Sequence, residues 1–345
     1  MTSDRLIITG ATGFIGSHIV NAFLEHSIRP ICLVRKTSRL EWFDRSCIDI
    51  RYGDIRDAGT LRSAFQGCSV LIHNAALAYD WGRKRDFYET NVDGTLNVLN
   101  ACVSNDVDHV IMTGTISSYG EEDSTVVKDE TSPYNSHYRY FLDRIFPCAM
   151  NYYRDTKARA TREAVRFAER HGLNLTVLEP TWVYGEREFN TGFYDYLKNA
   201  KNRFAIAPGS TKNNFHVVYA GDLARAYVLA YEKRIPGVER IIVGDETATN
   251  MDVLFSLLCA AAGLRKPATA HKYVLYPMAF LLELLYTMFR SKLPPPLTRG
   301  RVNMFYDSIQ YSTRKARTVL GFSSAHKLEQ GIHKTIQWYK ANGLL

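Results

Sequence analysis

Tyr153 and Lys157 stand four residues apart near the middle of the chain, and their side chains have complementary acid–base chemistry. On a helix this spacing places both side chains on one face, one turn apart. A free phenol has a pKa of about 10 and is protonated at neutral pH, but a neighbouring ammonium group favours the phenolate. The pair therefore predicts a site that takes up or releases a proton. Because this spacing is common by chance, the prediction depends on the elements around it.

A glycine-rich turn near the N-terminus supplies the first of these elements. A short apolar run ends at Thr9, Gly10, Gly13 and Gly16 follow, and an amphipathic stretch then extends to about residue 26. Gly10 permits a tight turn, Gly13 lets the backbone approach a diphosphate, and Gly16 lets the helix pack closely on the strand. A second strand-like run at 30–34 completes a βαβ unit. The pattern predicts a dinucleotide site with the phosphates at the helix N-terminus.

Strand-like and helical runs continue to alternate after this unit. Strands are predicted at 48–52, 69–73, 110–113 and 175–178, and helices near 58–66, 86–105 and 152–169. The alternation predicts an α/β fold with a Rossmann-type, doubly wound parallel sheet, in which ligands lie at the carboxyl ends of the strands. We expect residues 1–180 to form the NAD(P)-binding domain, with a strand and a helix near 215–233 returning to it. Residues 181–345 then form a smaller, mostly helical substrate lobe, with amphipathic helices at 251–262 and 312–320.

Two cations follow the second strand, where an NAD-binding turn usually carries an acid for the ribose 2′-hydroxyl. Arg35 and Lys36 suit a 2′-phosphate instead, so the sequence predicts a preference for NADP, with NAD possible. Asp54 is predicted to accept a hydrogen bond from the adenine amino group, and Ile55 to cover the ring. Two cations at an exposed turn are also compatible with no ligand at all.

The composition argues against several classes of protein function. Six cysteines are scattered without a Cys-x-x-Cys pair, and ten histidines form no metal-binding pattern, so we expect reduced thiols, no metal and a cytoplasmic location. The first residues lead directly into the nucleotide-binding strand and leave no room for a signal peptide. The net charge of +8 comes from short basic groups, and nothing resembles a nucleic-acid-binding module.

Several motifs together identify a family. They are the segments 9–16, 74–76, 91–95, 113–120 and 180–185, the Tyr153 and Lys157 pair, and residues 320–322 with 331–332. With these motifs the chain resembles an extended short-chain dehydrogenase/reductase over essentially its whole length. The resemblance implies that Tyr153 is the acid/base, that Lys157 holds the nicotinamide ribose and lowers the pKa of the tyrosine, and that Thr115 binds the substrate oxygen. Ser117 is the alternative to Thr115, and Tyr152 is the alternative to Tyr153.

The same resemblance assigns the remaining site residues. The predicted cofactor-binding residues are Gly10, Thr12, Gly13, Phe14, Ile15, Gly16, Arg35, Lys36, Asp54, Ile55, Asn74, Ala75, Ala76, Asn91, Thr113, Tyr153, Lys157, Pro180, Thr181 and Val183. The predicted substrate-binding residues are Tyr79, Trp81, Tyr119, Trp182 and Tyr184. A homodimer, paired through the helices near Asp86 and Tyr153, is expected by analogy only.

Branch-specific residues point to an apolar substrate. Ile116 and Ser117 stand where sugar-nucleotide dehydratases have an Asp-Glu pair, which argues against that activity. Residues 80–82, 298–299 and 331–339 resemble the branch of 3β-hydroxysteroid dehydrogenases, decarboxylating sterol dehydrogenases and bacterial β-keto reductases, and residues 34–35 resemble NADP-using dihydroflavonol reductases. The predicted reaction is hydride transfer between nicotinamide and a carbonyl or secondary alcohol. The alternatives are a nucleotide-sugar 4-epimerase and an NADP-binding sensor without catalysis.

Two unusual segments remain. Residues 121–151 are acidic and then rich in tyrosine and phenylalanine; an active-site lid is the hypothesis, and surface packing the alternative. Residues 273–289 are apolar except for Glu283 and contain Pro277, and at seventeen residues they are shorter than the ~20 that a membrane span requires. This helix is interpreted as a core helix, a substrate lid, or a segment in peripheral contact with a membrane, with Arg290 and Lys292 at the headgroups.

Overall fold

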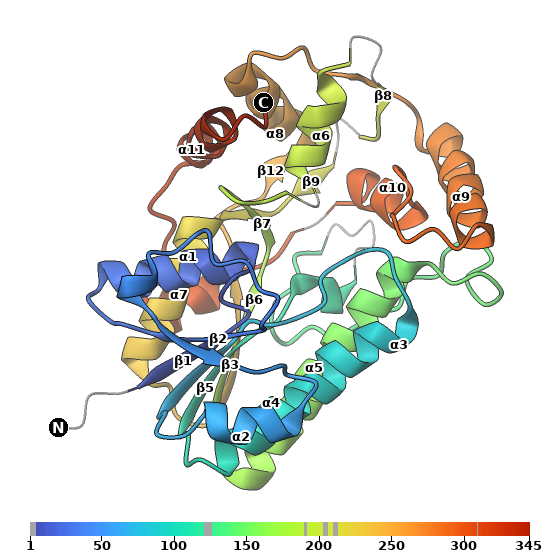
Figure 1. The fold of residues 1–345 in the computed structure, drawn as a ribbon. Helices are drawn as coiled ribbons and strands as arrows, with labels where there is room; N and C mark the ends of the chain where they lie inside the picture. The colour runs from blue at the N-terminus through green and yellow to red at the C-terminus, as the bar shows by residue number, and fades with distance from the viewer. Residues whose placement is uncertain (1–4, 121–125, 190–191, 203–205, 210–212, 309) are drawn as a thin grey trace.

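A parallel sheet of seven strands lies at the centre of the N-terminal part of the chain (Figure 1). The computed structural model describes residues 5–120, 126–189, 192–202, 206–209, 213–308 and 310–345. Across the sheet the strands follow the order β11 (Val238–Val243), β6 (Asn174–Pro180), β5 (His109–Thr113), β4 (Val70–His73), β1 (Leu6–Thr9), β2 (Ile31–Val34) and β3 (Asp49–Tyr52). Every neighbouring pair is parallel. The predicted Rossmann-type sheet is confirmed.

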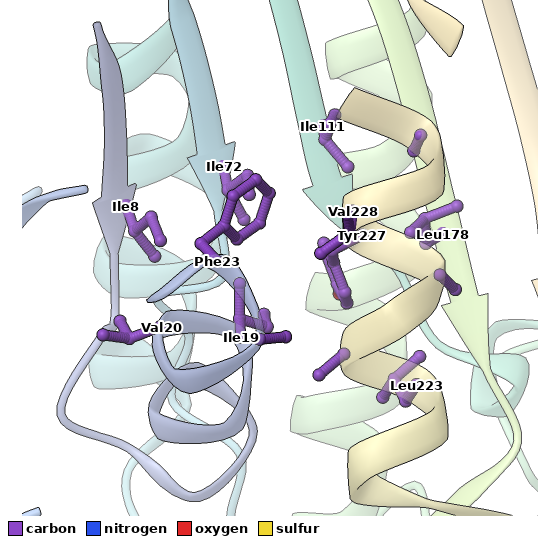
Figure 2. Packing of buried hydrophobic residues seen from close by; sticks show 14 of the residues in the cluster. Ile8, Ile19, Val20, Phe23, Ile72, Ile111, Leu178, Leu223, Tyr227 and Val228 are labelled. Carbon is purple, nitrogen blue, oxygen red and sulfur yellow. The ribbon is translucent and has the colours of Figure 1, made fainter. Parts of the chain in front are cut away.

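Helices cover both faces of this sheet. The helices α1 (Phe14–Glu25) and α7 (Ala220–Lys233) pack on one face, and α2 (Ala58–Ala64), α4 (Gly94–Val103) and α5 (Ala149–His171) pack on the other. Figure 2 shows Ile8, Ile72, Ile111 and Leu178 of the strands directed toward side chains of α1 and α7. Because successive strand residues point to opposite faces, Ile7 belongs to the core on the other side. Strands covered on both faces must be apolar throughout, which explains the continuous apolar runs in the sequence.

The C-terminal lobe has its own core. It contains α6 (Phe193–Ala200), α8 (Met251–Ala262) and α11 (Leu328–Ala341), packed around aromatic side chains. Figure 1 shows α9 (Lys272–Met288) and α10 (Arg299–Tyr306) side by side at the outer edge of this lobe, where they share a small apolar cluster. Three short strand pairs complete the lobe: β7 (Trp182–Tyr184) with β10 (Val217–Tyr219), β9 (Asn214–Phe215) with β12 (Thr249–Asn250), and β8 (Ile206–Ala207) with β13 (Ala268–Thr269).

Four details differ from the sequence prediction. The helix expected at 86–105 consists of α3 (Lys84–Phe87), the wider π-helical turn η2 (Tyr88–Asp93) and α4. The strand expected at 216–219 pairs with β7, outside the main sheet. The sheet instead gains β11, whose charged first half hides its strand pattern. Of the helix expected at 312–320, only residues 314–320 are helical, with η4 (Ala316–Leu320) wound as a π-helix.

In the described part of the tyrosine-rich segment, residues 126–151, the last three residues begin α5, and residues 126–148 contain no helix or strand. They make one isolated bridge, between Lys128 and Tyr311. Residues 121–125 lie outside the described residues. The segment packs across the molecule, because Tyr134 bonds to β6 and the rings of Phe141 and Phe146 contact Phe280 of α9. Its function as a lid stays a prediction.

Candidate active site

The glycine turn lies where the strand order reverses, between β1 and β4, which is the position at which open α/β sheets bind ligands. Gly10 has a φ of +68°, and a Cβ there would lie 2.7 Å from the amide nitrogen of Ala75. A Cβ on Gly16 would lie 2.0 Å from the carbonyl oxygen of Gly10. Both positions therefore require glycine, as predicted from the motif.

Gly13 differs from these two, because a Cβ there would approach no neighbour closer than 3.4 Å. The protein itself does not need the space, whereas a diphosphate would fill it. Gly13 is the N-cap of α1, and no side chain caps this helix end. Thr12, Phe14 and Ile15 are only partly buried around it. The uncapped first-turn amides and the open space fit the phosphates of a dinucleotide.

A chain of hydrogen bonds links this turn to the predicted catalytic lysine. The Asn74 amide donates to the Gly10 carbonyl over 3.4 Å, and the Thr113 hydroxyl donates to Asn74 Oδ1 over 2.9 Å. The Lys157 ammonium donates to the Thr113 carbonyl over 2.7 Å. The carboxyl ends of β1, β4 and β5 thus hold Lys157 in register with the glycine turn. The sequence placed each of these residues in the site, but not the bonds between them.

Lys157 is a buried cation, with only 5% of its surface exposed. Burial lowers its pKa to about 8, and the negative charge of Glu179 opposes this shift. His73 lies nearby between Thr9 and Thr95, bonded over 2.8 and 3.0 Å, and burial together with the Lys157 charge lowers its pKa to about 3. The histidine is therefore neutral and adds no second cation beside the lysine. Tyr153 is half-buried on α5, one turn before Lys157.

The two candidate hydroxyls lie at the end of β5. Thr115 is the N-cap of the 3₁₀ turn η3 (Ile116–Tyr119), and its oxygen accepts from the Ser117 amide over 3.2 Å. This bond uses the oxygen as an acceptor and leaves the hydroxyl proton for another group. Thr115 is buried and Ser117 half-buried. The geometry is compatible with either residue as the donor to a substrate oxygen.

The predicted adenosine residues lie at the ends of β2 and β3. Arg35 and Lys36 are exposed. Both oxygens of Asp54 accept from Arg56, and these hydrogen bonds hold the pKa of Asp54 below its ordinary value. Ile55 is buried against Gly94.

Asn91, in η2, has its side chain committed to the protein. It bonds to both backbone groups of Leu77 and to the Thr156 hydroxyl. Asn91 therefore ties the loop after β4 to α5, and its cofactor contact stays a prediction. The remaining predicted cofactor residues, Pro180, Thr181 and Val183, lie at and after the end of β6.

The five predicted substrate residues fall into two groups. Tyr119 and Tyr184 are fully buried, and their hydroxyls donate to Glu179 and to the Leu328 carbonyl. Tyr79, Trp81 and Trp182 are at least partly exposed. The Trp81 indole donates to the Ser291 carbonyl over 3.2 Å and contacts the Tyr286 ring edge-on, so it joins the loop after β4 to the end of α9. Substrate contact stays a prediction for all five.

A profile of the NAD dependent epimerase/dehydratase family matches residues 6–244. The chain belongs to this family. It is an NAD-dependent oxidoreductase of the extended short-chain dehydrogenase/reductase type, which confirms the predicted family and enzyme class. Among the described residues, no group of three His, Cys, Asp or Glu side chains is placed to hold a metal ion.

Three proteins illustrate the range of this family. A decarboxylating sterol-4-alpha-carboxylate 3-dehydrogenase of Candida albicans is 25% identical, with 97% of each chain covered. A putative dihydroflavonol 4-reductase of Synechocystis is 24% identical, with 99% of this chain and 96% of the relative covered. The crystal structure of a UDP-glucose 4-epimerase from Thermotoga maritima, with UDP-glucose, superposes with a TM-score of 0.76 at 22% identity, over 98% of this chain and 99% of that one. At that identity the epimerase is evidence for the fold alone.

Three sets of interacting side chains were not predicted from the sequence. Tyr227 of α7 bonds to the Thr113 hydroxyl over 2.6 Å. Glu179 of β6 accepts from two tyrosines, and Arg299 forms a buried ion pair with Glu283. The sequence did mark Glu179 and Glu283 as unusual, because each is the one charged residue in an otherwise apolar run. Their partners lie too far away in the sequence to be paired by inspection.

Proposed function

We propose that this protein transfers a hydride between NADP and a carbonyl or secondary alcohol of a small apolar molecule of the 3β-hydroxysteroid or β-keto type. The bound nicotinamide supplies the hydride chemistry. The Tyr153 phenol gives its proton to the alkoxide that forms on reduction, or takes it back on oxidation. Lys157 holds the nicotinamide ribose and lowers the pKa of Tyr153, and Thr115 stabilises the charge on the substrate oxygen.

One observation carries this proposal: the chain of hydrogen bonds from Gly10 through Asn74 and Thr113 to Lys157. It couples a turn that fits a diphosphate to a buried ammonium one helical turn from a phenol. The apolar substrate class is supported by the sterol dehydrogenase among the relatives.

A substrate screen tests the reaction class. Steroids, β-keto esters and nucleotide sugars are each incubated with NADPH and with NADH, and oxidation of the reduced nicotinamide is followed by its absorbance. We expect turnover with steroids or β-keto esters. An epimerase would retain its cofactor and change a nucleotide sugar without net absorbance change. Tight dinucleotide binding without any turnover would favour the sensor, which would have no use for the Tyr153 and Lys157 pair.

The cofactor preference can be tested at Arg35. We expect Arg35→Asp to lower kcat/KM for NADPH about tenfold or more relative to NADH, because a bidentate contact to the 2′-phosphate is replaced by like-charge repulsion. Steady-state kinetics with both cofactors measure the ratio. Arg39→Asp, a nearby exposed arginine, is the control and should leave the ratio unchanged. An unchanged ratio in Arg35→Asp would argue against NADP preference.

We propose further that α9 contacts a membrane surface peripherally. Its outward face carries the exposed apolar residues Val274, Met278, Leu281, Leu285 and Met288, spaced as one helical stripe. The 126–148 segment adds three more exposed apolar residues, Phe141, Leu142 and Ile145. Ile145 is 82% exposed, and Phe289, directly after α9, is 80% exposed. No helix within the described residues is long and apolar enough to cross a bilayer.

The charges around this face favour an anionic lipid surface as its partner. In 139–147 and 272–293 the two acids, Asp143 and Glu283, are occupied by hydrogen bonds within the protein. The exposed charged side chains of these two ranges are Arg139, Arg144, Arg290 and Lys292. A pocket of about 280 Å³ opens beside the end of α9, lined by Tyr286, Phe289, Ser291, Leu293 and Pro294. Two of these residues contact Trp81, because the Ser291 carbonyl accepts a hydrogen bond from its indole and the Tyr286 ring meets it edge-on.

Vesicle sedimentation tests the membrane contact. We expect binding to vesicles that contain phosphatidylserine, and about tenfold weaker partitioning for Leu281→Asp with Leu285→Asp, since two apolar anchors are lost. The control is Val253→Asp, an exposed apolar position on α8. Absence of binding to these vesicles would argue against the membrane contact. So would a dimer that forms without lipid in the wild type and is lost in the double variant. The proposal also includes a homodimer that pairs the helices near Asp86, in α3, and Tyr153, in α5, and a cytoplasmic location.

A further inference from the structure

A buried carboxylate lies directly behind the candidate catalytic residues and has no part in the reaction as described so far. Glu179, the residue before the end of β6, has 0% of its surface exposed. A Cβ on Gly114 would lie 2.6 Å from Glu179 Cγ, so the glutamate side chain packs against the backbone between Thr113 and Thr115. Those two residues receive the Lys157 ammonium and cap the η3 turn.

Two phenols donate to this carboxylate. The Tyr119 hydroxyl, at the end of η3, donates to Glu179 Oε2 over 2.5 Å, and the Tyr134 hydroxyl donates to Glu179 Oε1. Burial and the glutamate charge raise the pKa of both phenols, so both stay protonated. Each carboxylate oxygen therefore has one phenol within hydrogen-bond distance, and an ionised carboxylate can accept both bonds.

Among the described residues, Arg240 and Glu130 are charged groups that act on Glu179, while Arg162 and Lys128 donate to the backbone carbonyls of Tyr134 and Tyr119. The Arg240 guanidinium of β11 lies 4.8 Å from the centre of the Tyr134 ring and donates to the Glu130 carbonyl. The Glu130 carboxylate accepts from the Ile242 amide over 2.8 Å. Burial raises the pKa of Glu179, and the two tyrosine bonds and Arg240 oppose the shift. Around Lys157, the titratable neighbours are Tyr153, one helical turn earlier on α5, His73, which is neutral, and Glu179, whose charge raises the lysine pKa.

We propose that Glu179 is a positioning residue of the hydride-transfer site. Its carboxylate fixes the η3 turn and the Tyr134 segment at the end of β6, and its negative charge balances the Lys157 ammonium across Gly114. This inference rests on the proposed function, because it assigns Glu179 a task through Lys157 and Thr115. A buried acid without a directly bonded cation is costly in a strand core, and the balance with Lys157 accounts for its presence.

The test removes the charge and keeps one of the two acceptor oxygens; the amide nitrogen replaces the other and can donate to a phenol oxygen instead. In Glu179→Gln the Lys157 pKa should fall by about one unit. Because the site needs Lys157 as an ammonium, kcat/KM then begins to fall at a pH about one pH unit lower than in the wild type. Activity at pH 6 should change less than about threefold. Calorimetric titration with NADPH alone, across the same pH range, should show the same displacement in cofactor affinity. This second measurement needs no turnover.

Two variants serve as matched controls. Glu130→Gln removes a carboxylate whose charge acts on Glu179, and Tyr134→Phe removes one hydrogen bond to Glu179 without changing its charge. Both should keep the wild-type pH profile. A Glu179→Gln profile that coincides with the wild type, or that falls equally at every pH, would overturn the inference. Absence of turnover in the wild type would instead contradict the proposed function, and the NADPH titration would still decide the role of Glu179.

Discussion

Tyr153→Phe should lower kcat by about 10³-fold or more, with the dissociation constant for NADPH nearly unchanged. The phenol is the one proton donor or acceptor that the proposal places at the substrate oxygen, and general acid–base catalysis contributes up to about 10⁴-fold. The substitution deletes one oxygen atom from a half-buried ring, so the packing of α5 is retained. Single-turnover kinetics and calorimetric titration with NADPH measure the two quantities separately.

Tyr152→Phe is the matched control, because it removes the same atom from the neighbouring residue of the same helix. The Tyr152 ring lies 6.1 Å from the Phe87 ring of α3, on the side of α5 that packs against the loop after β4. We expect kcat to stay within about threefold of the wild type. Full activity of Tyr153→Phe together with loss in Tyr152→Phe would exchange the roles of the two tyrosines.

The parts of the fold that the sequence revealed are those whose signals are local. The glycine turn, the apolar strands covered on both faces, and α8, predicted with its observed ends, all follow from periodicity and backbone freedom within a few residues. β11 was missed because its first half is charged, and edge strands need not be apolar on both faces. The π-helical turn at Asn91 was missed because its cause is a set of bonds to Leu77 and Thr156, which no periodicity records.

The same distinction applies to the site. Gly10, Asn74, Thr113 and Lys157 could be assigned individually, since each stands at a strand end or on one helix face. Their hydrogen-bonded order depends on the parallel pairing of β1 with β4 and of β4 with β5, which brings segments 64 and 39 residues apart into contact, as Leu6 opposite Val70 and Val70 opposite His109 show. Trp81 was assigned to the substrate, and its bond to Ser291 shows that it also joins the two parts of the molecule.

The buried ion pair between Arg299 and Glu283 is a second feature that only the folded chain reveals. Glu283 is the one acid in the apolar helix α9, and it faces inward. The Arg299 backbone amide donates to Glu283 Oε1 over 2.5 Å, and the Arg299 guanidinium donates to Oε2 over 2.7 Å. The same guanidinium donates to the carbonyls of Phe141 and Phe146. Arg299 is fully buried and therefore ties α9, α10 and the 141–146 segment together. It also fixes which face of α9 points outward.

Arg299→Met should lower the free energy of unfolding by about 3–5 kcal/mol, because Glu283 would remain as an unpaired buried charge. The double variant Arg299→Met with Glu283→Leu should recover much of this loss, since two apolar side chains then replace both charges. The control is Arg29→Met, which breaks an exposed pair with Asp49 and should cost at most about 1 kcal/mol. Urea unfolding of the four proteins measures the differences. Equal losses for Arg299→Met and Arg29→Met would mean that the pair does not hold α9, and the outward direction of its apolar stripe would then need another cause.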